Sequence, residues 1–264
     1  MELSVLTENL PYLLWGAYPD GPLGGAALTL ILSLGSAVIS ALLGAVLGIA
    51  LAMTRGAVNT TLMLVLGFFR AIPVLMLIFW TYFLLPIAFG IDVPGILSVM
   101  FALSLIGAAY LAHSVCAGIQ GVRSGQWDAG LSLGLPRLAV LRHIILPQAL
   151  QMMMPSFVNQ WVTLIKDSSL AYIVGVGELS FVAAQVNSRV MIYPAEIFMF
   201  VGAIYFILCS SLDISAAQLA RYFQPPAIAA RRLRRSEQQR REQFRVSAPA
   251  GIAGTNRPAD SVRS

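Results

Sequence analysis

Residues 25–53 form an apolar run of 29 residues without one charged side chain. At about 1.5 Å per residue, a helix of this length exceeds the roughly 30 Å hydrocarbon core of a bilayer. The whole chain is 58% hydrophobic and only 11% charged, whereas a soluble domain carries about 25% charged residues. The apolar runs do not alternate with polar residues as the strands of a membrane barrel would. We therefore predict an all-α, polytopic membrane protein and exclude a soluble domain.

About five segments are long and apolar enough to cross the membrane, namely residues 25–53, 72–89, 94–119, 147–165 and 194–222. Arg70 and Pro73 interrupt the second apolar stretch. Because an arginine at the centre of a membrane costs several kcal/mol even on the lowest scales, we expect Arg70 near a membrane interface. Residues 60–69 would then form a separate helix that precedes the second span.

The first span carries a stripe of small residues at intervals of three or four. Its members are Gly25, Thr29, Ser33, Ser36, Ser40, Gly44 and Gly48. This spacing places them on one helix face, and small residues allow helices to approach closely in lipid. The stripe predicts a helix–helix interface.

The distribution of positive charge predicts the orientation. Residues 1–220 contain seven Lys and Arg against nine Asp and Glu, whereas residues 221–264 contain ten Arg against three acids. Because cytoplasmic loops are enriched in Lys and Arg, five spans with the N-terminus outside and the C-terminus in the cytoplasm fit the pattern.

Three regions follow from this orientation. Residues 1–24 are an N-terminal extracytoplasmic segment, residues 25–223 are the transmembrane domain, and residues 224–264 are a basic cytoplasmic tail. The tail composition favours partial disorder. Its arginines are expected to bind anionic lipid, so a nucleic-acid partner is not needed to explain them.

The cytoplasmic interval at residues 124–148 is the most informative segment. We expect a short amphipathic helix that ends at a glycine, a turn at Pro136, and a second helix closed by Pro147. Asp128 is expected near the N-terminus of the first helix, where an anion is favoured. Such a unit would present a small knob to a cytoplasmic partner. The alternative is an ordinary interfacial loop with Asp128 as a solvated acid.

The spacing of this segment resembles the coupling motif of ABC-importer permeases. The matching residues are Asp128, Ala129, Gly130, Gly134, Ile144, Leu146 and Pro147. Asp128 replaces the usual Glu and Gly130 the usual Ala of that motif. Residues 68–73 and 166–170 are similar to permeases for polar amino acids of the histidine, glutamine and glutamate type, although Ala71 stands where that family has Gly.

The resemblance implies a type I ABC importer permease in the bacterial inner membrane. Its partners would be a second permease subunit (the same chain or a paralogue), two cytoplasmic ATPase subunits and an external amino-acid-binding protein. No cofactor is expected on this chain. It has no phosphate-binding loop, because the sole lysine, Lys166, does not follow the glycines that such a loop needs. We therefore expect a transport subunit without enzymatic activity of its own, with ATP bound by a partner.

Candidate residues of the substrate path are Tyr110, His113, Asp167 and Ser168. Asp167 would meet the ammonium group of an amino acid, or alternatively pair with Lys166. His113 stands where the family usually has Glu, which favours a non-cationic cargo, with glutamate or aspartate as the first choice; the alternative is a hydrogen-bonded histidine at a helix interface.

Arg70, Pro73 and Lys166 are assigned gating or structural roles. Two other functions remain as alternatives. One is a stand-alone secondary transporter or channel, and the other is an intramembrane enzyme with Ser168 and Lys166 as a catalytic dyad. No metal site is expected, because the two histidines, His113 and His143, lie on different elements.

Overall fold

The computed structural model describes residues 3–90, 93–191 and 194–223. Within these ranges every regular element is a helix, and β-structure is limited to two isolated bridges. The prediction of an all-α fold is therefore confirmed. The relations between elements given below lie within the compact unit Met1–Ala220, and the predicted basic tail lies outside the described residues.

Three helices in the described part of the chain are long and apolar enough to span a membrane. They are α2 (Gly25–Met53), α6 (Gly95–Gly121) and the first 25 residues of α11 (Pro194–Phe223). The bent pair of α3 (Ala57–Ala71) with Val74–Phe89 supplies a fourth candidate span. These elements match four of the five predicted spans.

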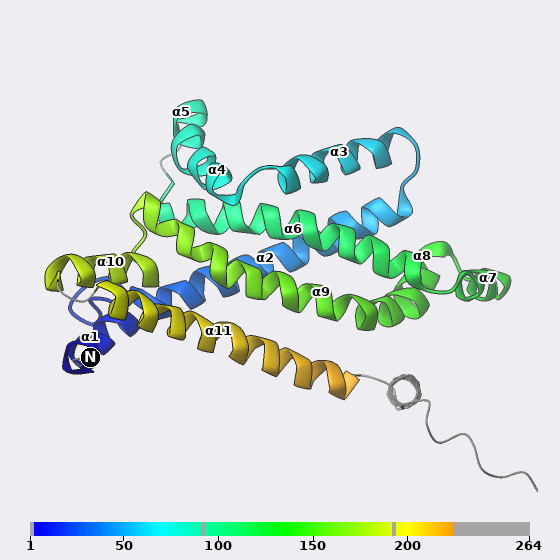
Figure 1. Cartoon of the computed structure of the whole chain (residues 1–264). Helices are drawn as coiled ribbons and strands as arrows, with labels where there is room; N and C mark the ends of the chain where they lie inside the picture. Colours follow the sequence, from blue (N-terminus) through cyan, green and yellow to red (C-terminus); the bar gives the residue numbers. More distant parts are fainter. Residues whose placement is uncertain (1–2, 91–92, 192–193, 224–264) are drawn as a thin grey trace, which may run out of the picture. The chain divides into compact units, whose positions relative to one another are not determined.

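The remaining predicted span, residues 147–165, corresponds to α9 (Leu146–Asp167), a helix of 22 residues. It is amphipathic because amide side chains such as Gln151, Asn159 and Gln160 interrupt its apolar residues. The helix packs along α6 in the opposite direction: Gly118 adjoins Met153, whereas Gly107 adjoins Leu164. Figure 1 shows α2, α6 and α9 running side by side.

The small-residue stripe of α2 is an interface, as predicted. All seven of its members are buried. A Cβ atom added at Gly48 would lie 2.5 Å from Cβ of Val115 and 2.6 Å from the carbonyl oxygen of Ala112. Gly44 approaches Leu111 as closely. The stripe therefore lets α2 and α6, which run in the same direction, pack with their backbones close together.

The second predicted span is broken. α3 ends at Ala71, Ile72 is extended, and the chain resumes as α4 (Val74–Phe79), the π-helical turn η1 (Trp80–Leu84) and α5 (Leu85–Phe89). The axes on the two sides of the break differ by 99°. Pro73 favours this break, because proline disfavours a helical conformation at the residue before it. Figure 1 shows α4 and α5 turned away from the line of α3.

The two ends of the α2–α6–α9 bundle carry different elements (Figure 1). α1 (Leu3–Trp15) and α10 (Leu179–Val190) lie at one end, and α7 (Ser124–Ser132) and α8 (Arg137–Val140) lie at the other. A buried cluster joins Leu13 of α1 to residues of α10 and α11. The predicted N-terminal segment thus contains a packed helix, which its sequence had not indicated.

Candidate functional site

The predicted coupling segment forms an exposed knob of two short helices. α7 ends at Ser132, and Gly134 has a φ of +78°, a left-handed conformation that favours glycine. Pro136 then precedes α8. Leu133, at the tip of the turn, has 80% of its surface exposed. The helix, glycine and proline turn lie where the sequence predicts them.

The expectation that Pro147 closes the second helix is wrong. α8 continues through the π-helical turn η2 (Leu141–Ile145) directly into α9. A proline in a regular helix clashes with the carbonyl four residues earlier, but the wider π turn makes room for the ring. The amide of Leu146 donates to the carbonyl of Leu141, and Nε2 of Gln148 donates to that of Ile144 at 2.7 Å.

Asp128 also lies elsewhere than expected. Arg123 is the N-cap of α7 and Ser124 its first residue, so Asp128 lies in the second turn with its side chain exposed. It cannot cap the helix from there. Exposed Asp128 and Ala129 instead form part of the surface that α7 presents outward.

Gly130 is the buried residue of α7 and marks its closest approach to the following helix. An added Cβ would lie 2.7 Å from Cγ2 of Val140 and 3.2 Å from Cδ1 of Ile144. The replacement of the family's usual alanine by Gly130 thus accompanies a tight contact between the two short helices. Of the remaining motif residues, Ile144 and Leu146 are half-buried and Pro147 is exposed.

Arg70 lies at the last turn of α3 with its guanidinium carbon 5.1 Å from the ring centroid of Tyr110. Tyr110 is eleven residues before Gly121, the last residue of α6. At about 1.5 Å per residue, Arg70 is therefore roughly 16 Å from that end of α6. The interface position expected for Arg70 therefore stays a prediction. α3 packs against α6, with Leu66 in a buried cluster that includes Cys116.

His113 lies one turn beyond Tyr110 on α6 and is half-buried. Its Nδ1 is 3.1 Å from the carbonyl oxygen of Ala109, four residues earlier in the same helix. The carbonyl can only accept, so Nδ1 carries the proton. The hydrogen bond that the alternative interpretation requires is thus satisfied within α6, and it leaves Nε2 for another partner.

Ser168 and Asp167 form a second group at the end of α9. Oγ of Ser168 is buried and donates to the carbonyl of Ile165 at 2.7 Å, with Oγ of Ser33 at 3.4 Å. Asp167 is half-buried, and exposed Lys166 lies near enough for electrostatic attraction to it. Because the Ser168 hydroxyl is engaged with a carbonyl, the Ser–Lys dyad of the enzyme alternative lacks its required contact.

The two groups of candidate residues lie at different heights along the bundle. Leu164 faces Gly107 of α6; Ser168 is four residues beyond that level in one direction and His113 six residues beyond it in the other. At about 1.5 Å per residue the two groups are roughly 15 Å apart along the helix axes. One bound amino acid cannot touch both groups at once, although both could line one path.

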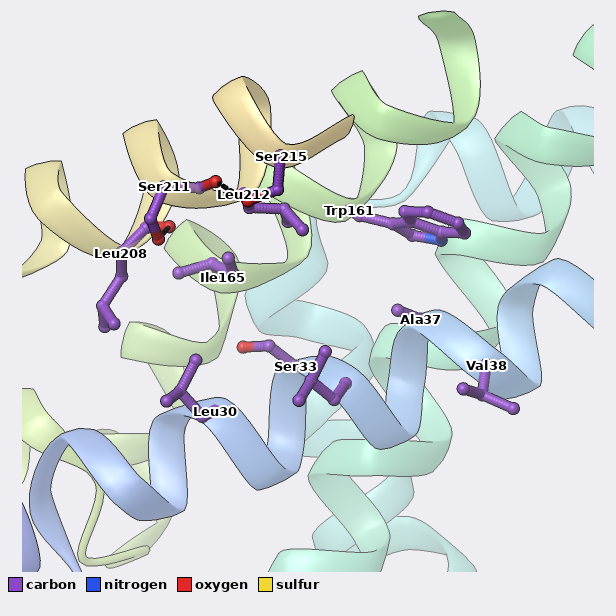
Figure 2. Close-up of a pocket in the computed structure, with 11 residues that line it drawn as sticks. Leu30, Ser33, Ala37, Val38, Trp161, Ile165, Leu208, Ser211, Leu212 and Ser215 are labelled. Atoms are coloured by element: carbon purple, nitrogen blue, oxygen red, sulfur yellow. Dashed lines mark hydrogen bonds between the residues drawn. The ribbon is translucent and has the colours of Figure 1, made fainter. Parts of the chain in front are cut away.

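A cavity of about 350 Å³ lies between α2, α9 and α11 (Figure 2). Its three serine hydroxyls, on Ser33, Ser211 and Ser215, each donate to a carbonyl of their own helix. Nε1 of Trp161 is buried and has no hydrogen-bond partner in the described part of the chain. The rest of the lining is apolar, for example Leu30, Ala37, Ile165 and Leu208. The cavity therefore suits an apolar group better than a polar amino acid.

A second cavity, of about 380 Å³, lies at the end of the bundle that carries α1 and α10. Its lining includes the backbone of several glycines together with polar side chains, among them Tyr12, Tyr82 and Gln185. The hydroxyl of Tyr12 donates to Oε1 of Gln185 at 2.7 Å. This cavity is the more polar of the two and faces away from the coupling knob.

Glu178 was assigned no role from the sequence, yet it is fully buried beside the second cavity. Its carboxylate accepts hydrogen bonds from the backbone amides of Ser180 and Phe181 at 2.9 Å and from the hydroxyl of Tyr205 at 2.8 Å. Burial raises the pKa of Glu178 to about 7, and the hydrogen bonds oppose that rise only in part. Gly175, with a φ of +76°, ends the 3-10 helix η3 (Ser168–Val174), and Glu178 is the N-cap of α10.

Comparison with known proteins finds one family match over most of the chain and several similar permeases. Residues 41–224 match the family described as binding-protein-dependent transport system inner membrane component. The glutamate/aspartate import permease protein GltK of Escherichia coli O6:H1 is 30% identical over 226 residues, which cover 83% of this chain and 96% of GltK. The probable glutamine ABC transporter permease protein GlnM of Bacillus subtilis is 33% identical over 224 residues, with the same coverage of 83% and 96%.

Relatives with a different named cargo match as well. The arginine transport system permease protein ArtQ of Bacillus subtilis is 28% identical over 212 residues, covering 79% of this chain and 90% of ArtQ. Among solved structures, the crystal structure of an amino acid ABC transporter with histidines superposes with a TM-score of 0.73 at 23% identity, covering 84% of this chain and 99% of that one. At that identity the superposition supports the fold alone.

Proposed function

The chain belongs to the family of binding-protein-dependent transport system inner membrane components, and we propose that it forms half of the membrane path of an importer for a polar, non-cationic amino acid. Glutamate or aspartate is the favoured cargo. The chain is a permease subunit and not an enzyme, so the energy for transport comes from a partner that hydrolyses ATP.

The exposed knob of α7 and α8 is the observation that carries this proposal. Its two helices are joined by a turn that needs the positive φ of Gly134, and its tip exposes Leu133. The second helix continues without interruption into α9, which packs along α6, so a displacement of the knob would be transmitted directly to a helix of the bundle. An ATPase subunit that holds the knob could thus move α9, which provides mechanical coupling.

The two ends of the bundle suggest where the other partners bind. We place the knob and the C-terminus in the cytoplasm, and α1, α10 and the polar cavity on the outer face toward the external binding protein. A second permease subunit, either the same chain or a paralogue, would complete the path. The arginines of the tail would attract anionic lipid, although they lie outside the described residues.

The cargo class rests on His113. A glutamate at that position would favour a cationic amino acid, whereas a histidine favours a neutral or acidic one. The relatives are named as permeases for glutamate and aspartate, for glutamine or for arginine. Sequence similarity alone therefore does not identify the cargo.

The test is uptake by proteoliposomes that contain the chain together with its ATPase subunits and binding protein. We expect ATP-dependent uptake of glutamate or aspartate, and we expect His113→Glu to lower that uptake severalfold while His113→Gln changes it little. Preferred uptake of arginine with His113 intact would refute the cargo assignment. Uptake by the purified chain without any ATPase subunit would instead support a stand-alone transporter.

A further inference from the structure

Arg70 has an unusual environment for a charged side chain. It is the only Lys or Arg between Arg55 and Arg123. Its guanidinium lies over the ring of Tyr110, and among the described residues no hydrogen bond or ion pair joins it to an acceptor. The charge is thus placed well inside the length of α6 with an aromatic face as its contact.

This contact occupies only one surface of the guanidinium. The contact with the ring involves no hydrogen bond in the described part of the chain, and the guanidinium carries five N–H donors in its plane. These donors match the two oxygens of a carboxylate in a bidentate arrangement. Tyr110 therefore orients Arg70 and leaves the donors that recognise a carboxylate available.

Arg70 is exposed, and it lies level with Tyr110, about 16 Å from one end of the candidate span α6. Ionisable groups inside a membrane are costly and face a water-filled path or an oppositely charged partner. The break between α3 and α4 follows Arg70 by two residues, and broken helices of this kind border substrate sites in transporters. His113, on which the cargo class rests, lies three residues beyond Tyr110 on α6, about one helical turn away.

We propose that Arg70 binds the α-carboxylate of the cargo amino acid while it passes through the membrane. This inference rests on the proposed function, and it changes Arg70 from a gating or structural residue to a binding one. Tyr110 acts as a positioning residue that holds the guanidinium. Arg70 recognises the α-carboxylate, which all amino acids share, and His113 discriminates between their side chains.

Direct binding to the purified transporter complex, without the binding protein, tests the proposal. The probes are radiolabelled glutamate and competing isoglutamine, which carries an amide in place of the α-carboxylate. We expect Arg70→Gln to weaken glutamate binding at least about tenfold, since a charge-assisted hydrogen bond is lost, and to abolish the preference for glutamate over isoglutamine. Arg70→Lys should retain part of both. Arg55→Gln, at an exposed arginine after α2, is the matched control.

The outcomes separate this inference from the function on which it rests. A wild-type complex that shows no ATP-dependent uptake of any polar amino acid would refute the function. A wild-type complex that transports, with Arg70→Gln binding glutamate as tightly and as selectively as before, would refute only the role of Arg70. Failure of both Arg70 variants to assemble with the ATPase would also overturn the inference, because it would make Arg70 structural. Tyr110→Leu, with Arg70 intact, should weaken binding by a smaller factor.

Discussion

The carboxyl group of Glu178 makes stability depend on pH. In the folded chain its pKa is raised to about 7 by burial, against an ordinary value of 4.5. Between these two pH values the folded chain retains a proton that the unfolded chain has released. The free energy of unfolding is therefore greatest below pH 4.5 and falls as the pH rises toward 7, by roughly 3 kcal/mol at most.

Thermal unfolding in detergent between pH 5 and pH 8 measures this effect. We expect the Tm of the wild-type chain to fall as the pH rises, and we expect Glu178→Gln to flatten that dependence, because a glutamine has no proton to lose. Glu196→Gln, on the half-buried acid at the start of α11, is the control and should retain the wild-type slope. A wild-type Tm that rises with pH across this range would contradict the assignment.

At the scale of the helices, the contact between α2 and α6 depends on glycine. A methyl group at Gly48 would meet both a β-carbon and a backbone oxygen of α6, so the helices would have to separate. We expect Gly48→Ala to destabilise the chain by about 1–3 kcal/mol, as overpacking does. Gly67→Ala in α3, where no atom lies within 4 Å, should be neutral or slightly stabilising. Equal Tm values for the two variants would argue against close helix contact.

Local sequence patterns predicted most helices because each has a local cause. The stripe of α2, the break at Pro73 and the turn at Gly134 all follow from side-chain size or backbone geometry within a few residues. Pro147 was misjudged, since the π-helical turn that accommodates it is not visible in the residue pattern. The contact of Arg70 with Tyr110 could not be predicted either, because it depends on how α3 lies along α6, which is a tertiary relation.

At the scale of the whole molecule, the candidate residues lie in three places along one bundle, namely at each of its ends and in its middle. The sequence located the knob because its motif is continuous, but it grouped His113 with Ser168 although α9 carries them to different heights. Glu178 was missed for the same reason: its partner Tyr205 is 27 residues away on another helix. Local sequence patterns do not reveal contacts between segments that are distant in the chain.

The orientation of the bundle leads to a prediction for intact cells. In a background where Cys116 and Cys209 are replaced by alanine, Asp20→Cys and Leu133→Cys introduce thiols at exposed positions near opposite ends. If α1 faces outward and the knob faces the cytoplasm, a membrane-impermeant maleimide should label Asp20→Cys in spheroplasts. It should label Leu133→Cys only after the membrane is permeabilised, and co-expressed ATPase should reduce even that labelling because it covers the knob. The reverse pattern would invert the topology and remove the knob as the site of energy coupling.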